Sequence, residues 1–164
     1  MIRELVVFLE FQDKTEFEGK TQIIAEARFL RAYFHFELVK WFGEIPMKGD
    51  KRFVPGDETS IPRSPVADVY ASIYEDLIYA AANLDPVASQ TGRATSGAAT
   101  ALLGKAYLYE ASQTENVETY KLAAAKLQQV IDSEGYSLVA DFDEIFEMAG
   151  ENGPESVFEI QYTD

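Results

Sequence analysis

Residues 25–47 carry the most informative hydrophobic pattern in the chain, because apolar positions fall on two opposite sides of a predicted helix. At 100° per residue, one side carries an apolar stripe made of Ile23, Ala27, Leu30, Phe34, Leu38 and Trp41. The opposite side carries a second stripe made of Phe29, Ala32, Phe36 and Val39. A row of Arg28, Arg31 and His35 lies between the two stripes. A helix that is apolar on two sides packs between neighbours, so the pattern predicts a layered helical array.

Turn and capping residues delimit this long helix and the helices on either side of it. Capping-box patterns at 13–16 and 15–18 place its start between residues 13 and 21, and Gly43 is a natural residue to end it. A shorter amphipathic helix is expected over residues 1–13. Ser64 and Pro65 suit the N-cap and the first position of a third helix. Residues 44–63 remain as a long connection, and a loop of this length usually carries function or folds back on a neighbour.

Two further helices and a terminal strand complete the pattern. Thr95 or Ser96 caps a helix over about 96–112, and a cleanly periodic helix follows over about 117–134 until Gly135. A short helix is expected near 141–148. Residues 156–162 alternate between apolar and polar positions, which predicts a strand. Its partner would have to come from the 44–55 region, another chain or residues beyond this sequence, so we expect the chain to be part of a longer protein.

A degenerate helical repeat underlies this arrangement. Leu103, Gly104 and Tyr107 match the first-helix core of a tetratricopeptide repeat, in which glycine lets the partner helix approach and tyrosine fills the interface. Leu30 and Phe34 occupy the equivalent frame of the long helix. We therefore expect a mainly α fold, a tetratricopeptide-like α-α superhelix with a short C-terminal β-strand. It would form a single domain over residues 1–164, with helical hairpins at about 17–83 and 96–134.

Motifs along the chain also occur in the order typical of one protein family. The long helix carries EARFLRAYF at 26–34 and is followed by WFGEIP at 41–46. Further along come PRSP at 62–65, GRAT at 92–95, ALLGKAYLY at 101–109 and ESVFEIQY at 155–162. This ordered set resembles the SusD/RagB family of outer-membrane nutrient-binding lipoproteins. The resemblance singles out eight signature residues, to which we assign a structural role: Arg28, Leu30, Arg31, Gly43, Pro46, Arg93, Gly104 and Tyr107.

The resemblance implies a function as well as a fold. SusD-like proteins bind glycans at the cell outer membrane beside a TonB-dependent transporter and are not enzymes. In this family the repeat region is a scaffold that contacts the transporter, while sugar contacts come largely from loops outside it. We therefore carry over no ligand-binding residue and expect the isolated chain to be inert toward glycan. A free-standing tetratricopeptide-like module for protein–protein binding remains the alternative, with a small acidic hydrolase as a weaker one.

Composition and charge restrict the choice of partners. The 164 residues include 28 acidic and 14 basic side chains, and the resulting net charge of −14 argues against nucleic acid and against anionic membrane surfaces. With no cysteine, the chain has neither disulfides nor thiolate metal sites. No apolar run approaches the length of a transmembrane helix, and we expect that residues 2–11 do not act as a signal peptide. Full-length family members begin with a lipoprotein signal and an anchor cysteine, which places them at the cell surface through a lipid.

Residues capable of chemistry are few. The single histidine, His35, is interpreted as structural, and the arginines beside it are expected to pair with carboxylates such as Asp76 or Glu110 on adjacent helices. Pairs of acidic residues carry little information in so acidic a chain, and no nucleophile motif or phosphate loop occurs. We therefore predict no catalytic, cofactor-binding or metal site. Trp41 and Tyr33 are interpreted as core residues, whereas Phe53, flanked by Lys51 and Arg52, is the one aromatic residue expected to be exposed.

Overall fold

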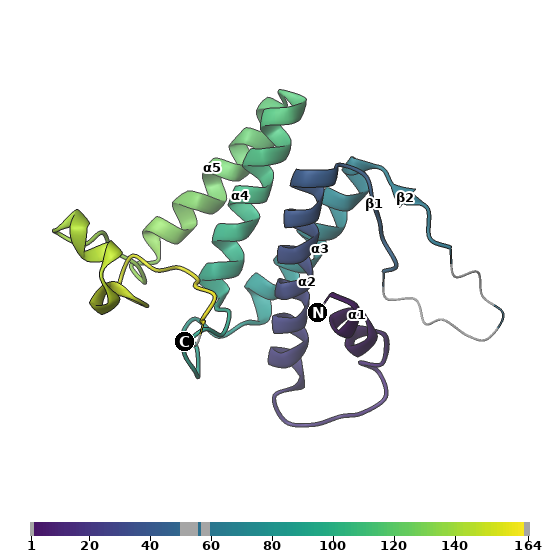
Figure 1. Ribbon diagram of the computed structural model, residues 1–164, viewed down its shortest axis with the longest axis horizontal. Coiled ribbons are helices and arrows are strands. Elements are labelled where there is room, and N and C mark those ends of the chain that lie inside the picture. The colour runs from purple at the N-terminus through teal and green to yellow at the C-terminus, as the bar shows by residue number, and fades with distance from the viewer. Residues whose placement is uncertain (1, 50–55, 57–59, 163–164) are drawn as a thin grey trace. The chain divides into compact units, whose positions relative to one another are not determined.

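The computed structural model describes residues 2–49, 56 and 60–162, and most of its regular structure is helical (Figure 1). The described α-helices are α1 (Ile2–Glu10), α2 (Lys20–Phe42), α3 (Val66–Asn83), α4 (Ser96–Thr114) and α5 (Val117–Asp132). The remaining elements are two-residue strands, β1 (Ile45–Pro46) and β2 (Arg63–Ser64), and 3₁₀ turns, η1 (Phe142–Phe146) and η2 (Met148–Gly150). The prediction of a mainly α fold is confirmed. The chain divides into two compact units, Met1–Asn83 and Leu84–Asp164.

In the first unit, α2 packs against both α1 and α3. The α2–α3 pair is antiparallel, because Gly43 lies beside Val66 at one end and Arg28 lies over the Tyr79 ring toward the other. Fully buried apolar side chains form its core: Phe29, Ala32 and Phe36 from α2, and Val69, Tyr70, Ile73 and Leu77 from α3. α1 adds a smaller cluster in which Leu9 packs with Ile24 and Ala27.

Burial around α2 differs from the prediction that both apolar stripes are buried between neighbouring helices. The stripe of Phe29, Ala32, Phe36 and Val39 is buried, and Arg31 and His35 in the polar row are buried beside it. In the other stripe only Ala27 is buried, while Ile23 is 38% exposed and Trp41 is 79% exposed. The expected core role of Trp41 is therefore wrong. The reason is that α2 has one continuous buried face and not two separate ones. The polar row lies at the centre of this face, where Asp76 of α3 compensates its charge.

The two ends of α2 are capped in different ways. At the C-terminal end Gly43 takes φ 66° and its N–H donates to the carbonyl of Val39 at 3.0 Å, as expected for a helix that stops at glycine. At the N-terminal end the N-cap is Gly19 in the left-handed region, with no side-chain cap. The predicted capping boxes are therefore wrong, although Lys20 falls within the predicted range. Glu16 instead accepts from Lys20 Nζ at 2.5 Å.

A small β-ladder closes the base of the long connection between α2 and α3. β1 and β2 pair antiparallel, with Ile45 opposite Ser64 and Pro46 opposite Arg63. The Pro65 carbonyl accepts from the N–H of Val69 at 3.1 Å, so Pro65, and not Ser64, occupies the N-cap position of α3. Phe53, with Lys51 and Arg52, lies outside the described residues.

In the second unit, α4 and α5 form an antiparallel pair that meets at Gly104. A Cβ added at Gly104 would lie 2.9 Å from Leu127 Cδ2 and 3.3 Å from the Leu127 backbone nitrogen, so the missing side chain permits the close approach. The Thr95 side chain caps α4 by accepting from the N–H of Ala98 at 3.1 Å. Asn116, which the sequence did not single out, caps α5.

The predicted strand at 156–162 is not formed in the part of that segment which the structure describes. Side-chain bonds join the segment to Asn152 instead. The amides of Asn152 and Gln161 bond to each other at 3.0 and 3.2 Å, and Glu159 accepts from the N–H of Asn152 at 3.0 Å. The alternating pattern of residues 156–162 was therefore not enough to form a strand, because a strand also needs a neighbouring strand with which to pair. The short helix expected near 141–148 takes the form of the 3₁₀ turns η1 and η2.

Candidate functional site

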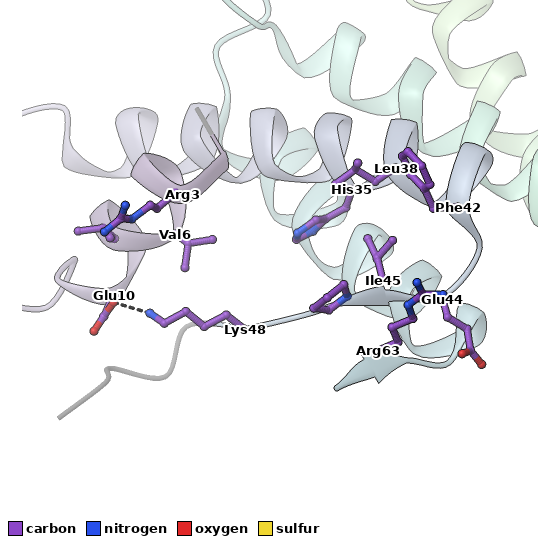
Figure 2. A pocket seen from close by; sticks show the side chains of 12 residues that line it. Arg3, Val6, Glu10, His35, Leu38, Phe42, Glu44, Ile45, Lys48 and Arg63 are labelled. Carbon is purple, nitrogen blue, oxygen red and sulfur yellow. Dashed lines mark hydrogen bonds and ion pairs between the residues drawn. The ribbon is translucent and has the colours of Figure 1, made fainter. Parts of the chain in front are cut away.

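The first unit contains a pocket of about 680 Å³ between α1, the C-terminal half of α2 and the β1–β2 ladder (Figure 2). Its apolar lining consists of Val6, Val7, Leu38, Phe42, Ile45 and Pro46. Its polar lining consists of Arg3, Glu10, His35, Glu44, Lys48 and Arg63. We call it the His35 pocket. An apolar cavity of this size with a few polar groups has the character of a ligand site.

His35 is the most deeply buried polar group of this pocket. Its side chain comes from the buried face of α2, is 6% exposed, and has an Nδ1 atom without a hydrogen-bond partner among the described residues. Burial, and then the nearby charge of Arg31, lower the pKa of His35 from 6.5 to about 4. At neutral pH the imidazole is therefore uncharged, with one ring nitrogen able to donate and the other able to accept.

Charged side chains surround this neutral group. Lys48 Nζ donates to Glu10 Oε2 at 2.5 Å, which ties the segment after β1 to α1 (Figure 2). Arg3, Glu44 and Arg63 are exposed. The lining therefore includes three basic and two acidic residues, whereas the whole chain carries −14. The pocket is thus a weakly basic place on an acidic protein.

The charges of Arg28 and Arg31, the arginines next to His35, are compensated from within the unit. Arg31 makes a bidentate pair with Asp76 of α3, with Nε to Oδ2 and Nη2 to Oδ1 both at 2.7 Å. Arg28 Nη1 lies 3.5 Å from Asp76 Oδ1, and its guanidinium lies 4.4 Å from the centre of the Tyr79 ring. The predicted pairing with Asp76 is confirmed. Since a carboxylate already occupies the arginine fork, this cluster acts in the packing of α2 on α3.

The other signature residues are divided between the units. Pro46 lines the His35 pocket from β1, Gly43 ends α2 directly after the pocket-lining Phe42, and Leu30 is half-buried on α2. Gly104 and Tyr107 lie on the buried side of α4, where burial, and then the charge of Glu110, raise the pKa of the Tyr107 phenol. The eight residues are therefore not brought together into one site.

Arg93 lines a different cavity, of about 560 Å³, in the second unit. This cavity lies between the residues before α4, the end of α5 and the segment 152–159. Thr95 and Tyr136, both in its lining, form a hydroxyl–hydroxyl hydrogen bond of 3.1 Å across it. Its lining mixes apolar and polar loop residues, and its hydroxyl pair of Thr95 and Tyr136 is already bonded, so it carries a weaker case for a ligand than the His35 pocket.

Sequence reasoning missed two features of the His35 pocket. Phe42 was not singled out, yet it is 68% exposed and lines the pocket at the end of α2. Its position directly before the helix-ending Gly43 was the signal that could have found it. The pair of Glu10 and Lys48 joins residues 38 apart and has no signal in the local pattern.

Among the residues with defined positions, no three His, Asp, Glu or Cys side chains are placed to hold a metal ion. None of the helices that the structure describes is both long and apolar enough to cross a membrane.

Comparison with known proteins decides the family. A SusD-like family model, described as starch-binding associating with outer membrane, matches residues 1–108. The chain belongs to the SusD-like family. It is 31% identical to a SusD-like protein of Bacteroides ovatus over 148 residues, which cover 88% of this chain and 27% of that protein.

Solved SusD-like structures share the fold. The crystal structure of a SusD-like protein from Bacteroides fragilis matches with a TM-score of 0.84 and 31% identity, covering 98% of this chain and 31% of that one. A laminarin binding SusD-like protein matches with a TM-score of 0.82 and 29% identity, covering 96% of this chain and 34% of that one. The chain thus spans between about a quarter and a third of the length of these SusD-like relatives.

Proposed function

We propose that the chain is the helical-repeat region of a SusD-like glycan-binding protein of the outer membrane, a scaffold that contacts a TonB-dependent transporter. The carrying observation is the family match over residues 1–108, whose description is starch-binding associating with outer membrane. The likeness to a laminarin binding protein over 96% of the chain supports a carbohydrate as the ligand. The role is one of binding and not of catalysis, and surface attachment through a lipid belongs to the proposal for the whole protein.

The domain organisation is part of the same proposal. The pairs α2–α3 and α4–α5 would be successive tetratricopeptide-like hairpins of one domain, at about 17–83 and 96–134. The antiparallel geometry within each pair supports this, as does the close helix approach at Gly104. A scaffold role also suits the Arg31–Asp76 pair, which uses buried charge to fix how α2 packs on α3.

The proposal is tested on the product of the complete reading frame, tagged and expressed in its own host. We expect it to be retarded in native gels that contain laminarin or starch, and to co-purify with an outer-membrane transporter identified by mass spectrometry. An acidic protein without sugar affinity serves as the gel control. Co-purification of an unrelated protein, without retardation on any polysaccharide, would instead identify a protein–protein interaction module.

A further inference from the structure

We infer that the His35 pocket is itself a glycan subsite, which takes one or a few sugar rings of a neutral glycan. This inference rests on the proposed function and adds a location to it within this chain. It also departs from the expectation that the chain is inert toward sugar.

The decisive group is the imidazole of His35 at the floor of the pocket. Figure 2 shows the ring projecting from α2 into the space between α1 and β1. Its Nδ1 is buried without a partner among the residues that the structure describes, and such an atom is costly unless something bonds to it. A hydroxyl group both donates and accepts, so it satisfies either tautomer of the neutral ring. An apolar occupant, such as a leucine side chain, would leave this nitrogen unsatisfied.

The walls suit the other property of a sugar ring, its apolar C–H faces. Phe42 contributes an aromatic ring that is 68% exposed, and Leu38 and Ile45 continue the apolar surface. A ring stacked on Phe42 would keep its polar edge free of these walls. The volume of about 680 Å³ lies within the roughly 300–1,000 Å³ of typical ligand pockets.

The mouth supplies polar partners for hydroxyls that point outward. Arg63 and Glu44 are exposed there, on the strand side, and the Glu10–Lys48 pair stands on the side of α1 (Figure 2). Charged side chains of both signs bond to sugar hydroxyls without requiring charge on the sugar. The pocket lining carries a net charge of only +1, whereas the chain as a whole carries −14, which repels acidic glycans at long range. A neutral glycan therefore fits better than a uronate.

The test uses the sole histidine as a reporter within the intact 164-residue chain. Nitrogen-15 spectra of the imidazole at pH 7 are recorded while oligosaccharides of laminarin, starch and a polyuronate are added. We expect the Nδ1 signal to shift saturably with at least one neutral series and to stay unchanged with the uronate. A saturable shift with the uronate alone would overturn the assignment to neutral glycans.

Three variants separate the pocket from the surface around it. Phe42→Ala, at an exposed position, should weaken the affinity about ten-fold or more because the stacking face is lost. His35→Leu should weaken it by a similar factor without lowering the thermal midpoint, because it removes a buried polar atom that lacks a partner. Trp41→Ala is the matched control, since Trp41 is 79% exposed on the same helix but does not line the pocket. Its affinity should match that of the unaltered chain.

The outcomes distinguish this inference from the function on which it rests. If glycan shifts no His35 signal while the product of the complete reading frame still binds, the subsite is wrong and the proposed function stands. The same conclusion follows if the chain binds but Phe42→Ala and His35→Leu bind as tightly as Trp41→Ala. If neither the chain nor the product of the complete reading frame binds any glycan, both proposals fall.

Discussion

At the residue scale, the buried charge of the first unit is concentrated on Asp76, whose side chain is 1% exposed. It accepts both bonds from Arg31 and lies within 3.5 Å of Arg28, so one carboxylate compensates two guanidinium groups. Removing one partner of a buried pair leaves an uncompensated charge, which costs far more than the pair itself contributes. The arginine row therefore depends on Asp76 more than on any apolar contact.

Replacing Asp76 tests this dependence. Asp76→Ala should lower the free energy of unfolding by about 3–5 kcal/mol, measured by urea denaturation, because Arg31 stays buried without its partner. Glu75→Ala, one residue away and exposed, is the matched control and should change it by less than about 0.5 kcal/mol. Equal losses in the two variants would show that the buried pair has no special role.

His35 gives the second residue-scale prediction, a stability that depends on pH. Its pKa is about 4 in the folded chain, against an ordinary value of 6.5 for an exposed imidazole, so between these two values the unfolded chain binds more protons. The contribution of the neutral imidazole to the free energy of unfolding is complete above about pH 6.5 and is lost as the pH falls toward 4. The shift corresponds to about 2 kcal/mol lost between pH 7 and pH 4.5.

Comparison with His35→Leu isolates this effect from the carboxylates, which titrate in both proteins. Urea unfolding of the unaltered chain should lose about 2 kcal/mol more than that of the variant over this pH interval. Arg31, behind the ring, and Glu10 and Glu44, in the pocket lining, are present in both proteins. Parallel losses in the two proteins would mean that His35 keeps an ordinary pKa.

At the element scale, the close packing of α4 on α5 depends on Gly104, which has no side chain. A Cβ at Gly104 would lie 2.9 Å from two carbons of Leu127, and 3.3 Å from a backbone nitrogen that moves only with α5. Glycine in a helix costs about 1 kcal/mol relative to alanine, so its presence here is explained by packing and not by propensity.

Adding the methyl group at this position should therefore destabilise the pair despite the better propensity. Gly104→Ala should lower the free energy of unfolding by on the order of 1 kcal/mol, because overpacking outweighs the gain in helix propensity. In a Leu127→Ala background the same substitution should be neutral or stabilising, since the main obstacle is gone. Urea denaturation of the four proteins in this cycle measures the coupling, and an equal effect of Gly104→Ala in both backgrounds would contradict it.

Elements whose cause is local could be predicted, and those that depend on a distant partner could not. Periodicity gave the helices, and glycine gave the end of α2, because both act within one turn. The β1–β2 ladder joins segments far apart along the chain, so local pattern did not predict it. The segment 156–162 forms no strand among the described residues, so its alternating pattern gave a wrong prediction. The arginine–Asp76 pair was predictable, since buried arginines in a helical array need an acid on the neighbouring helix.

At the scale of the whole molecule, the candidate pocket could not be predicted from the sequence either, because it depends on contacts between distant segments. His35 and Pro46 were singled out from the sequence, but nothing in the local pattern showed that α1 would lie across from them with Glu10 bonded to Lys48. Exposure was also misjudged for Trp41, because periodicity reports which residues share a face and not whether a neighbour covers that face. Which side of α2 is covered is decided by α1 and α3 together.

Two opposing properties of the whole chain set its behaviour in solution. Each unit leaves large apolar side chains exposed, among them Trp41 and Phe42 in the first and Phe146 and Met148 in the second. Exposed apolar surface favours self-association, whereas a net charge of −14 keeps copies of the chain apart. Because salt screens the charge and leaves hydrophobic attraction intact, ionic strength decides which property wins.

We therefore expect the weight-average mass at pH 7 to rise when sodium chloride increases from about 20 mM to about 500 mM, where the Debye length falls from roughly 20 Å to a few Å. Sedimentation velocity at several protein concentrations measures this rise. The double variant Phe146→Ser/Met148→Ser should reduce it, because two side chains exposed by 74% and 84% are removed without a change of charge. Gln128→Ser/Gln129→Ser, also at exposed positions, is the matched control and should leave the rise unaltered. A mass that is the same at both salt concentrations would show that these apolar side chains do not drive association, and the balance of charge and apolar surface argued for this chain would be wrong.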